Sequence, residues 1–317
     1  MSFIFITEQG TTLKKESEKL ILASDETEIL TIPVINTDGI VIFGNVQVTS
    51  QTISLLAYKG IPLSFLTMDG NLKAIVEPVP QKNLDLRYLQ YLANLDESTS
   101  LKISKLFIEG KIEGILHFYK NNRRKNGTTG LRTIRKTYKK ISASVAAAGS
   151  YESLLGYEGS ASKEHFTLYS SLFNNEIIFS IRSKRPPKDP ANALLSFGYC
   201  LLQNYLTGLI SVTGLDKYVG FLHKPDYNRP SLVLDFMEIF RAPIVDRFVL
   251  NICNIPYFKN SDFSDSDERG FYLKDESRKK FLKLWGEFLF ENRQFIWNRF
   301  NHYALQVVKI IRNNNID

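Results

Sequence analysis

Glu77-Pro78-Val79-Pro80-Gln81-Lys82 separates two parts of the chain in which apolar residues recur with different periods. Each proline fixes φ and lacks an amide hydrogen, so neither a central strand nor a helix continues through the pair. Before it, short alternating apolar runs predict strands, and after about Leu84 the apolar residues follow a helical spacing. We therefore expect an α+β protein with a small N-terminal β-domain at residues 1–76, a linker at 77–83 and a larger all-α domain at 84–317.

In the N-terminal part, apolar runs between turn residues locate the individual strands. We expect strands at residues 2–7, 19–23, 28–34, 40–43, 46–48, 63–67 and 72–76, and a short helix at 50–59. Asp69-Gly70 is a typical hairpin turn between the last two strands. The β-domain is thus predicted to close just before the proline pair.

The composition excludes several classes of protein. With 317 residues, of which 44% are hydrophobic, the chain can bury a sizeable core, which excludes wholesale disorder. Its two cysteines, Cys200 and Cys253, cannot form a disulfide framework or a four-cysteine zinc site. The N-terminus lacks the order of basic, apolar and small residues that is typical of a signal peptide, so we expect a cytoplasmic protein.

One uncharged segment, residues 191–215, is long enough to span a bilayer. Polar side chains interrupt it, and each of them would need a hydrogen-bonding partner in hydrocarbon. They are Asn192, Ser196, Gln203, Asn204, Thr207, Ser211 and Thr213. A buried central helix is therefore predicted in place of a membrane span.

The net charge of +7 is distributed unevenly. Residues 1–80 hold five lysines and no arginine against nine acidic residues, whereas residues 101–140 hold twelve Lys or Arg against Glu109 and Glu113. Such a density of cations favours a surface that neutralises phosphates, and a solvated helical face is the alternative. Residues 126–130, Asn-Gly-Thr-Thr-Gly, predict a tight connection between two basic helices in this segment.

The four histidines differ in their surroundings. His117, His165 and His302 occur in helical patterns, where surface or rim positions without a ligand role are expected. His223 instead ends the apolar run Val219-Gly220-Phe221-Leu222 and lies in a loop just before a helix. It is the histidine that we consider a candidate for chemistry.

The helix that follows His223 carries Asp235 and Glu238, three residues apart and hence on one face of an otherwise apolar helix. A buried carboxylate pair is costly unless a metal ion, an arginine or a proton compensates it. An ion pair of one acid with Arg241 or Arg247 is the alternative to a site.

A third carboxylate, Glu158, lies between glycines in Gly156-Tyr157-Glu158-Gly159, where the backbone can approach a ligand closely. A glutamate, a histidine and a second carboxylate could form an oxygen and nitrogen site open on one side, which suits manganese or magnesium. The sequence by itself does not bring Glu158 close to His223.

Four ordered blocks carry a resemblance to a known family. They are GYEGSAS at residues 156–162, RPPKDPANALLSFGY at 185–199, GFLH at 220–223 and RPSLVLDFMEIFRAPIVD at 229–246. Together they resemble the motifs of the universal endonuclease and integrase of CRISPR adaptation, the larger of the two core spacer-acquisition proteins. The order of a β-domain before an α-domain agrees with that family.

The resemblance implies that Glu158, His223 and Glu238 are catalytic ligands of Mg²⁺ or Mn²⁺, with Asp235 in a supporting role. Asn192 belongs to one of these motifs, and a role in helix packing is favoured for it over contact with the site. The residues expected to contact DNA backbones are Arg123, Arg124, Lys125, Arg132, Arg135, Lys136, Lys139, Lys184 and Arg185.

The implied activity is that of a metal-dependent DNA endonuclease and integrase, which inserts foreign fragments into a CRISPR array by attack of 3′-hydroxyl ends at the repeat. Its implied partners are double-stranded DNA, a second copy of the chain contacted through the β-domain, and the small second adaptation protein in a heterohexamer, with no membrane. Two other functions stay open: a metal-dependent nuclease acting on branched repair intermediates, and a non-catalytic architectural DNA-binding protein.

Overall fold

The computed structural model describes residues 2–24, 27–68, 70, 72–76, 84–211, 213–227, 229–266 and 270–313, apart from the side chains of Ser2, Asn36 and residues 123–129. The predicted linker at 77–83 lies outside this range. The chain divides into two compact units, Met1–Lys82 with Asp275–Phe295 and Asn83–Lys274 with Ile296–Asp317. Residues 275–295, which the sequence grouped with the helical domain, thus belong to the N-terminal unit.

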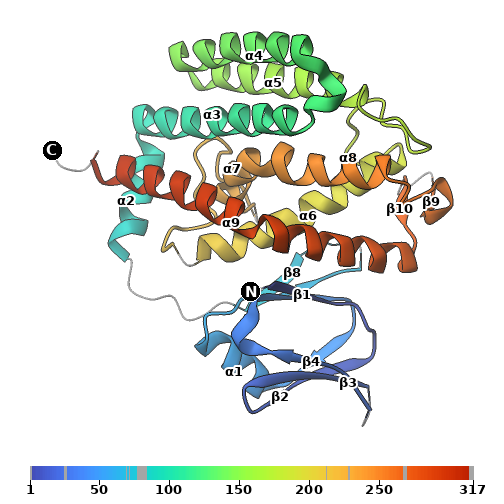
Figure 1. Ribbon diagram of the computed structural model, residues 1–317. Helices are drawn as coiled ribbons and strands as arrows, with labels where there is room; N and C mark the ends of the chain where they lie inside the picture. Colours follow the sequence, from blue (N-terminus) through green and yellow to red (C-terminus); the bar gives the residue numbers. More distant parts are fainter. Residues whose placement is uncertain are drawn as a thin grey trace. The chain divides into compact units, whose positions relative to one another are not determined.

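The N-terminal unit consists mainly of two four-stranded sheets with the strand orders β1-β5-β7-β8 and β4-β3-β2-β6 (Figure 1). Its elements are β1 (Ser2–Ile6), β2 (Thr11–Glu16), β3 (Lys19–Ser24), β4 (Thr27–Pro33), the 3₁₀ turn η1 (Val34–Asn36), β5 (Thr37–Phe43), β6 (Val46–Val48), α1 (Ser50–Tyr58), β7 (Leu63–Leu66) and β8 (Leu72–Val76). Side chains of both sheets and of α1 form one hydrophobic core, with Leu13, Ile40 and Leu63 fully buried.

The strand β2 was missed by the sequence pattern, because Thr11–Glu16 contains a single apolar residue, Leu13. Pairing on both sides compensates for this weak pattern. β2 is antiparallel to β3 and parallel to β6, so its backbone hydrogen bonds and the burial of Leu13 hold it in the sheet.

The second unit is mostly helical, and the expected order of a β region followed by helices is confirmed. Its elements are α2 (Leu84–Leu95), α3 (Glu97–Asn121), α4 (Arg123–Ala147), α5 (Tyr151–Ser170), α6 (Pro190–Ser211), α7 (Ser231–Phe240), the π-helical turn η2 (Arg241–Asp246), α8 (Arg247–Asn254), the 3₁₀ turn η3 (Asn260–Asp262), β9 (Phe263–Ser264) and β10 (Tyr272–Leu273). α9 (Asp275–Asn313) begins in the N-terminal unit and ends in the helical unit. A short antiparallel pair, β9 and β10, accompanies the helices of this unit.

The predicted connection at residues 126–130 is wrong, because these residues belong to the helix α4. The chain instead turns at Asn122, which follows α3 and precedes α4. A glycine inside a helix costs only about 1 kcal/mol, and α4 packs against both α3 and α5. Figure 1 shows these three helices side by side.

Two glycines of α3 bring α7 close to it. A Cβ atom on Gly114 would lie 2.7 Å from the carbonyl oxygen of Ile239 on α7, and one on Gly110 would lie 3.0 Å from Cγ1 of the same residue. Because Gly110 and Gly114 are four residues apart, they lie on one face of the helix. The close approach places Glu238, the neighbour of Ile239, beside the α3 residue Lys111.

The uncharged helix α6 is long and apolar enough to span a membrane, but 72% of its most apolar window is buried inside the protein. Asn192 at its start is fully buried. Its amide donates to the carbonyl of Ile181 at 2.8 Å, and its Oδ1 accepts from the backbone of Ser183 at 2.9 Å. These bonds hold the preceding segment against α6, in agreement with the expected packing role.

Candidate active site

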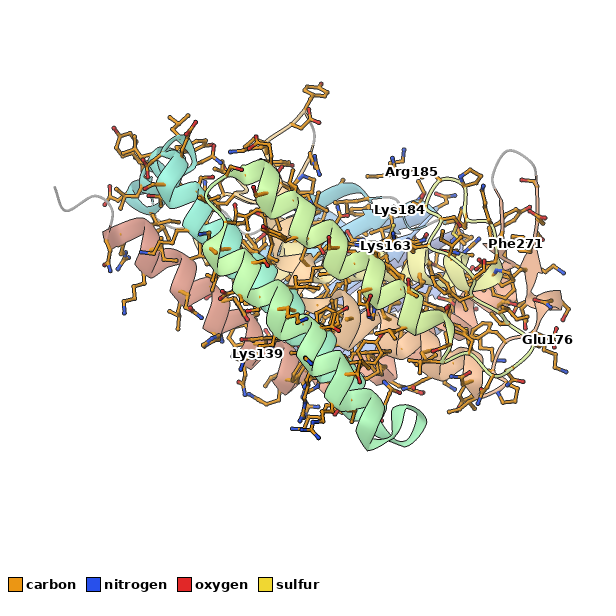
Figure 2. All side chains as sticks on the ribbon, turned by 90° about the horizontal axis from the view of Figure 1, so that it is seen from above. Lys139, Lys163, Glu176, Lys184, Arg185 and Phe271 are labelled. Atoms are coloured by element: carbon orange, nitrogen blue, oxygen red, sulfur yellow. The ribbon has the colours of Figure 1, made fainter. Side chains whose placement is uncertain are left out.

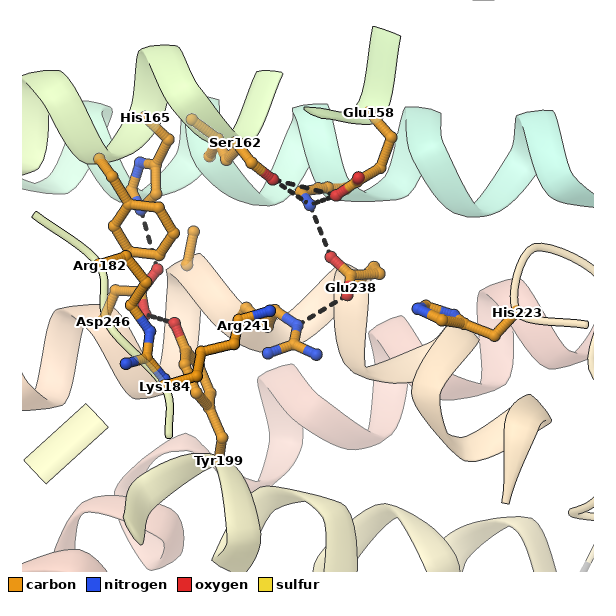
Figure 3. A pocket seen from close by; sticks show the side chains of 14 residues that line it. Glu158, Ser162, His165, Arg182, Lys184, Tyr199, His223, Glu238, Arg241 and Asp246 are labelled. Atoms are coloured by element: carbon orange, nitrogen blue, oxygen red, sulfur yellow. Dashed lines mark hydrogen bonds and ion pairs between the residues drawn. The ribbon is translucent and has the colours of Figure 1, made fainter. Parts of the chain in front are cut away.

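A cavity of about 170 Å³ in the helical unit is bordered by α3, α5, α7 and the segment that precedes α6 (Figure 3). Glu158, Glu238 and His223 line one part of it. Arg182, Lys184 and Arg241 line another part. The cavity therefore combines metal-ligating groups with cations.

A buried lysine joins the two glutamates of the cavity. The ammonium of Lys111 on α3 contacts Glu158 Oε1 on α5 and donates to Glu238 Oε2 on α7 at 2.7 Å. It also donates to Ser162 Oγ at 2.7 Å, and Ser162 donates to Glu158 Oε1 at 3.0 Å. Three helices are thus tied together by one side chain.

Burial and charge oppose each other in this cluster. Burial by itself would raise the pKa of Glu238, but Arg241 and Lys111 outweigh it and hold that pKa well below its usual range. Burial would lower the pKa of Lys111, but Glu238 and Glu158 outweigh it and raise that pKa. Both groups are therefore charged at neutral pH, as a buried ion pair whose remaining lone pairs and protons have partners.

The second carboxylate of α7, Asp235, holds the loop that carries His223. Its side chain is fully buried and accepts the backbone N–H groups of Phe221 at 2.6 Å, Leu222 at 3.2 Å and His223 at 2.7 Å. Asp235 Oδ1 lies 2.8 Å from Nδ1 of the imidazole. A carboxylate acceptor fixes the proton on Nδ1, which leaves the lone pair on Nε2. Figure 3 shows the ring of His223 directed towards Glu238.

The three predicted ligands line the same cavity, but they do not form a finished metal site. Among the residues that the structure describes, no three His, Cys, Asp or Glu side chains are arranged to hold a metal ion. The ammonium of Lys111 lies between the two glutamates. Two carboxylates and an imidazole Nε2 are nevertheless a donor set that suits Mg²⁺ or Mn²⁺.

The cationic part of the cavity is built around Tyr199. The guanidinium of Arg241 lies 4.7 Å from the centre of that ring and donates through Nε to Glu238 Oε1 at 2.8 Å. The guanidinium of Arg182 lies 5.4 Å from the same ring. Partial burial, together with Arg241 and Arg182, lowers the pKa of Lys184. The sequence offered Arg241 and Arg247 as ion-pair partners for the acids of α7, and Arg241 is the one that pairs with Glu238.

His165 corrects a sequence prediction. It was expected at the surface or at a rim, whereas its side chain is buried and its Nε2 lies 2.8 Å from Asp246 Oδ2. Asp246 also accepts from the hydroxyl of Tyr199, and its backbone carbonyl accepts from Tyr169 at 2.9 Å. Figure 3 shows His165 and Asp246 on the side of the cavity away from His223. His302 is exposed and His117 is half-buried, as expected.

The charge pattern of the sequence does not distinguish Lys111 from the other cations of residues 101–140. It lies, however, four residues after Phe107 and four before Ile115, both of which are buried. A lysine on the apolar face of a helix is rarely buried unless it is paired. The position of Lys111 on the apolar face of its helix was therefore the signal in the sequence that indicated a buried, paired lysine.

The candidate DNA contacts on α4 face outward. Arg132, Arg135, Lys136 and Lys139 are exposed, whereas Leu131, Ile134 and Tyr138 on the other face are buried. Figure 2 labels Lys139 on this helix. Lys184 and Arg185 are exposed as well. The side chains of the predicted contacts Arg123, Arg124 and Lys125 lie outside the described part of the chain.

The family model described as CRISPR associated protein Cas1 matches residues 4–287 of the chain. The CRISPR-associated endonuclease Cas1 3 of Thermus thermophilus is 35% identical over 285 residues, which cover 89% of this chain and 83% of the relative. The solved structure of a Cas1 protein from Thermotoga maritima is 26% identical, covers 97% of both chains and superposes with a TM-score of 0.82.

Two more distant solved structures share the fold. A casposase bound to its integration product is 24% identical and covers 91% of this chain and 83% of its own, with a TM-score of 0.75. A chain of a partial Cas6-RT-Cas1–Cas2 complex is 22% identical and covers 99% and 96%, with a TM-score of 0.69.

Proposed function

The chain belongs to the Cas1 family of CRISPR-associated proteins, and we propose that it is the endonuclease and integrase that inserts DNA fragments into a CRISPR array. The observation that carries this proposal is the meeting of Glu158, Glu238 and the Asp235-held His223 in one cavity beside a cluster of cations. Such a cavity combines ligands for a divalent ion with groups that attract phosphate.

The Cas1 family is generally metal-dependent, and we propose Mg²⁺ or Mn²⁺ for this chain. Glu158, Glu238 and Nε2 of His223 would hold the ion, and it would lower the pKa of a water or a DNA 3′-hydroxyl and stabilise charge on the attacked phosphate. Asp235 fixes the ring of His223 and the loop that carries it. Its role is therefore to position a ligand.

The cations of the cavity have a separate task in this proposal. Arg241 is held in place by Glu238 and stacks on Tyr199, so its remaining guanidinium N–H groups can donate to phosphate oxygens. Lys184 adds a second charge at the cavity wall. Farther away, the exposed cations of α4 would hold the DNA backbone without reading bases.

We also propose the partners and the setting of the reaction. Joining a fragment with two 3′ ends needs two sites at a fixed separation. The family resemblance implies one site in each chain, so a homodimer meets that need. The solved complex that contains both Cas1 and Cas2 supports assembly with a small second adaptation protein. The N-terminal β-domain is proposed to make these contacts, and the cytoplasm is proposed as the location.

A strand-transfer assay tests the proposal. Purified protein, with and without the small partner, is incubated with a short DNA fragment and a separate repeat-containing duplex in Mg²⁺ or Mn²⁺. Joined products that require Glu158 support an integrase, and cleavage without joining favours a nuclease acting on branched repair intermediates. DNA binding without either product would leave only the architectural function. The variant Glu152→Ala on the exposed start of α5 is the control, because this acid lies outside the cavity.

A further inference from the structure

Lys111 is the only lysine among the described side chains that is buried. Its ammonium carries three protons, and three acceptors surround it: Glu158 Oε1, Ser162 Oγ and Glu238 Oε2. These acceptors come from α5 and α7, whereas the lysine comes from α3. The ammonium is therefore fully satisfied at one defined point between the two glutamates.

That point is also where a cation is needed. Two carboxylates that face each other across a cavity, one buried and one partly buried, repel one another unless a positive charge lies between them. Arg241 engages Glu238 through Oε1, the oxygen that Lys111 leaves free. No such arginine contact is found at Glu158 among the described residues, so Lys111 is the cation that joins the pair.

We propose that Lys111 is an internal counter-ion, which occupies the position between Glu158 and Glu238 in the metal-free protein and is displaced when the divalent ion enters. This inference rests on the proposed metal site. A divalent ion bound by the same two carboxylates would lie within a few ångströms of the ammonium, and like charges at that distance repel strongly in a buried site. The flexible four-carbon stem of the lysine allows the ammonium to leave without movement of α3.

The counter-ion has two opposite effects on the protein. Without metal, Lys111 stabilises the fold, because it neutralises the buried carboxylate of Glu238 and the partly buried carboxylate of Glu158 on two other helices. With metal, the same contacts must be broken first, so the lysine weakens the apparent affinity for the ion. Removing the ammonium while keeping its stem should therefore lower stability and raise metal affinity together, which a merely structural lysine would not do.

The experiment compares wild type with Lys111→Met, which keeps the unbranched stem without the charge. Dissociation constants for Mn²⁺ are measured on the metal-free proteins by calorimetry, and melting temperatures are recorded with and without Mn²⁺. We expect Lys111→Met to have a lower melting temperature than wild type without metal and to bind Mn²⁺ at least about ten-fold more tightly. Its melting temperature should also rise more than that of wild type when Mn²⁺ is added. Lys163→Met on α5 is the control, because Lys163 is exposed and lies next to Ser162, and it should match the wild type.

A folded Lys111→Met protein that binds Mn²⁺ no more tightly than wild type would overturn the inference. If this variant does not fold, Lys111→Gln retains a polar end that can bond to one glutamate and should shift both quantities in the same directions. The wild type gives an independent measurement, since labelling of Lys111 by an amine reagent, followed by mass spectrometry, should rise several-fold relative to Lys163 when Mn²⁺ is added. Unchanged labelling would contradict displacement.

The same measurements separate this inference from the metal site on which it rests. If the wild type binds Mn²⁺ and Glu158→Gln abolishes binding, the metal site stands whatever Lys111 does. If neither wild type nor Lys111→Met binds Mn²⁺, the metal site itself is wrong, and the counter-ion proposal fails with it.

Discussion

Asp235 accepts three consecutive backbone N–H groups, from Phe221 to His223, and its Oδ1 also lies 2.8 Å from Nδ1 of His223. One buried carboxylate thus fixes both the loop and the ring that it carries. The helix α7 thus has two roles, because it supplies Glu238 and also supplies Asp235, which fixes the orientation of the His223 imidazole.

Replacing Asp235 by Asn should therefore weaken metal binding and strand transfer by roughly 10 to 100-fold, as for other groups that orient metal ligands. The amide keeps the size of the side chain but accepts fewer N–H groups. Metal affinity from calorimetry and turnover should fall together, and the loop should become more mobile in hydrogen exchange. Asp226→Asn, in the exposed part of the same loop, is the matched control. Unchanged metal affinity in Asp235→Asn would show that Asp235 does not position His223 for metal binding.

The three proposed ligands should behave as one unit. Alanine at Glu158, His223 or Glu238 should abolish cleavage and strand transfer while leaving DNA affinity nearly intact, because affinity comes from the cationic surface. Double variants should be no worse than single ones, since a site that lacks one ligand already fails to hold its ion. Turnover, DNA affinity and melting are measured on the same preparations. A folded, DNA-binding His223→Ala protein with full strand-transfer activity would falsify the assignment.

The exposed cations of α4 should control affinity for DNA and its dependence on salt. Alanine at Arg132, Arg135 and Lys136 should weaken binding similarly for all DNA sequences and flatten the log-log salt dependence, by up to about 0.9 for each phosphate that is no longer neutralised. The triple change Arg123, Arg124 and Lys125 to alanine should act in the same way. Lys73→Ala on the exposed strand β8 should leave the slope unchanged. An unaltered slope in both triple variants would make these cations a solvated face.

The lowered pKa of Glu238 predicts how stability depends on pH. Burial opposes ionisation, but Arg241 and Lys111 keep the folded-state pKa below the unfolded value near 4.5. The carboxylate therefore contributes stability above that value, and the contribution is lost as the pH falls through the folded-state pKa. Glu238→Gln should be less stable than wild type at pH 7, by roughly 3–5 kcal/mol for a broken buried pair. Its stability should fall less on acidification, and denaturant unfolding from pH 7 to pH 3 checks this. If the free energies of unfolding of wild type and Glu238→Gln fell in parallel with pH, the prediction would be contradicted.

Gly114 should be intolerant of even one added carbon atom. Because a Cβ there would lie 2.7 Å from the carbonyl oxygen of Ile239, alanine must push α7 away from α3, at a cost of about 1–3 kcal/mol. Gly159→Ala on α5 is the control, since nothing lies within 4 Å of its added carbon and alanine favours a helix. Melting temperatures should move in opposite directions. A displacement of α7 should also lower strand transfer, because Glu238 moves with it.

Short-range patterns in the sequence were enough to predict the architecture. The proline pair and the change of hydrophobic period predicted a β region followed by helices, because the spacing of apolar residues depends on neighbours within a turn or a strand. The same reasoning placed Asp235 and Glu238 on one face of a helix. It missed β2, in which one apolar residue, Leu13, is held by two neighbouring strands, and it assigned residues 126–130 to a turn that the packing of α4 converts into a helix.

Only the tertiary structure decided which charged groups meet. Lys111 and Glu158 are 47 residues apart, and Lys111 and Glu238 are 127 apart, so no local period connects them. The burial of His165 against Asp246 likewise depends on a helix 81 residues away. Charges on separate helices are brought together only when apolar faces pack and glycines such as Gly114 let the backbones approach. The free energy of that packing comes from contacts throughout the helical unit, so it cannot be inferred from a motif of a few residues.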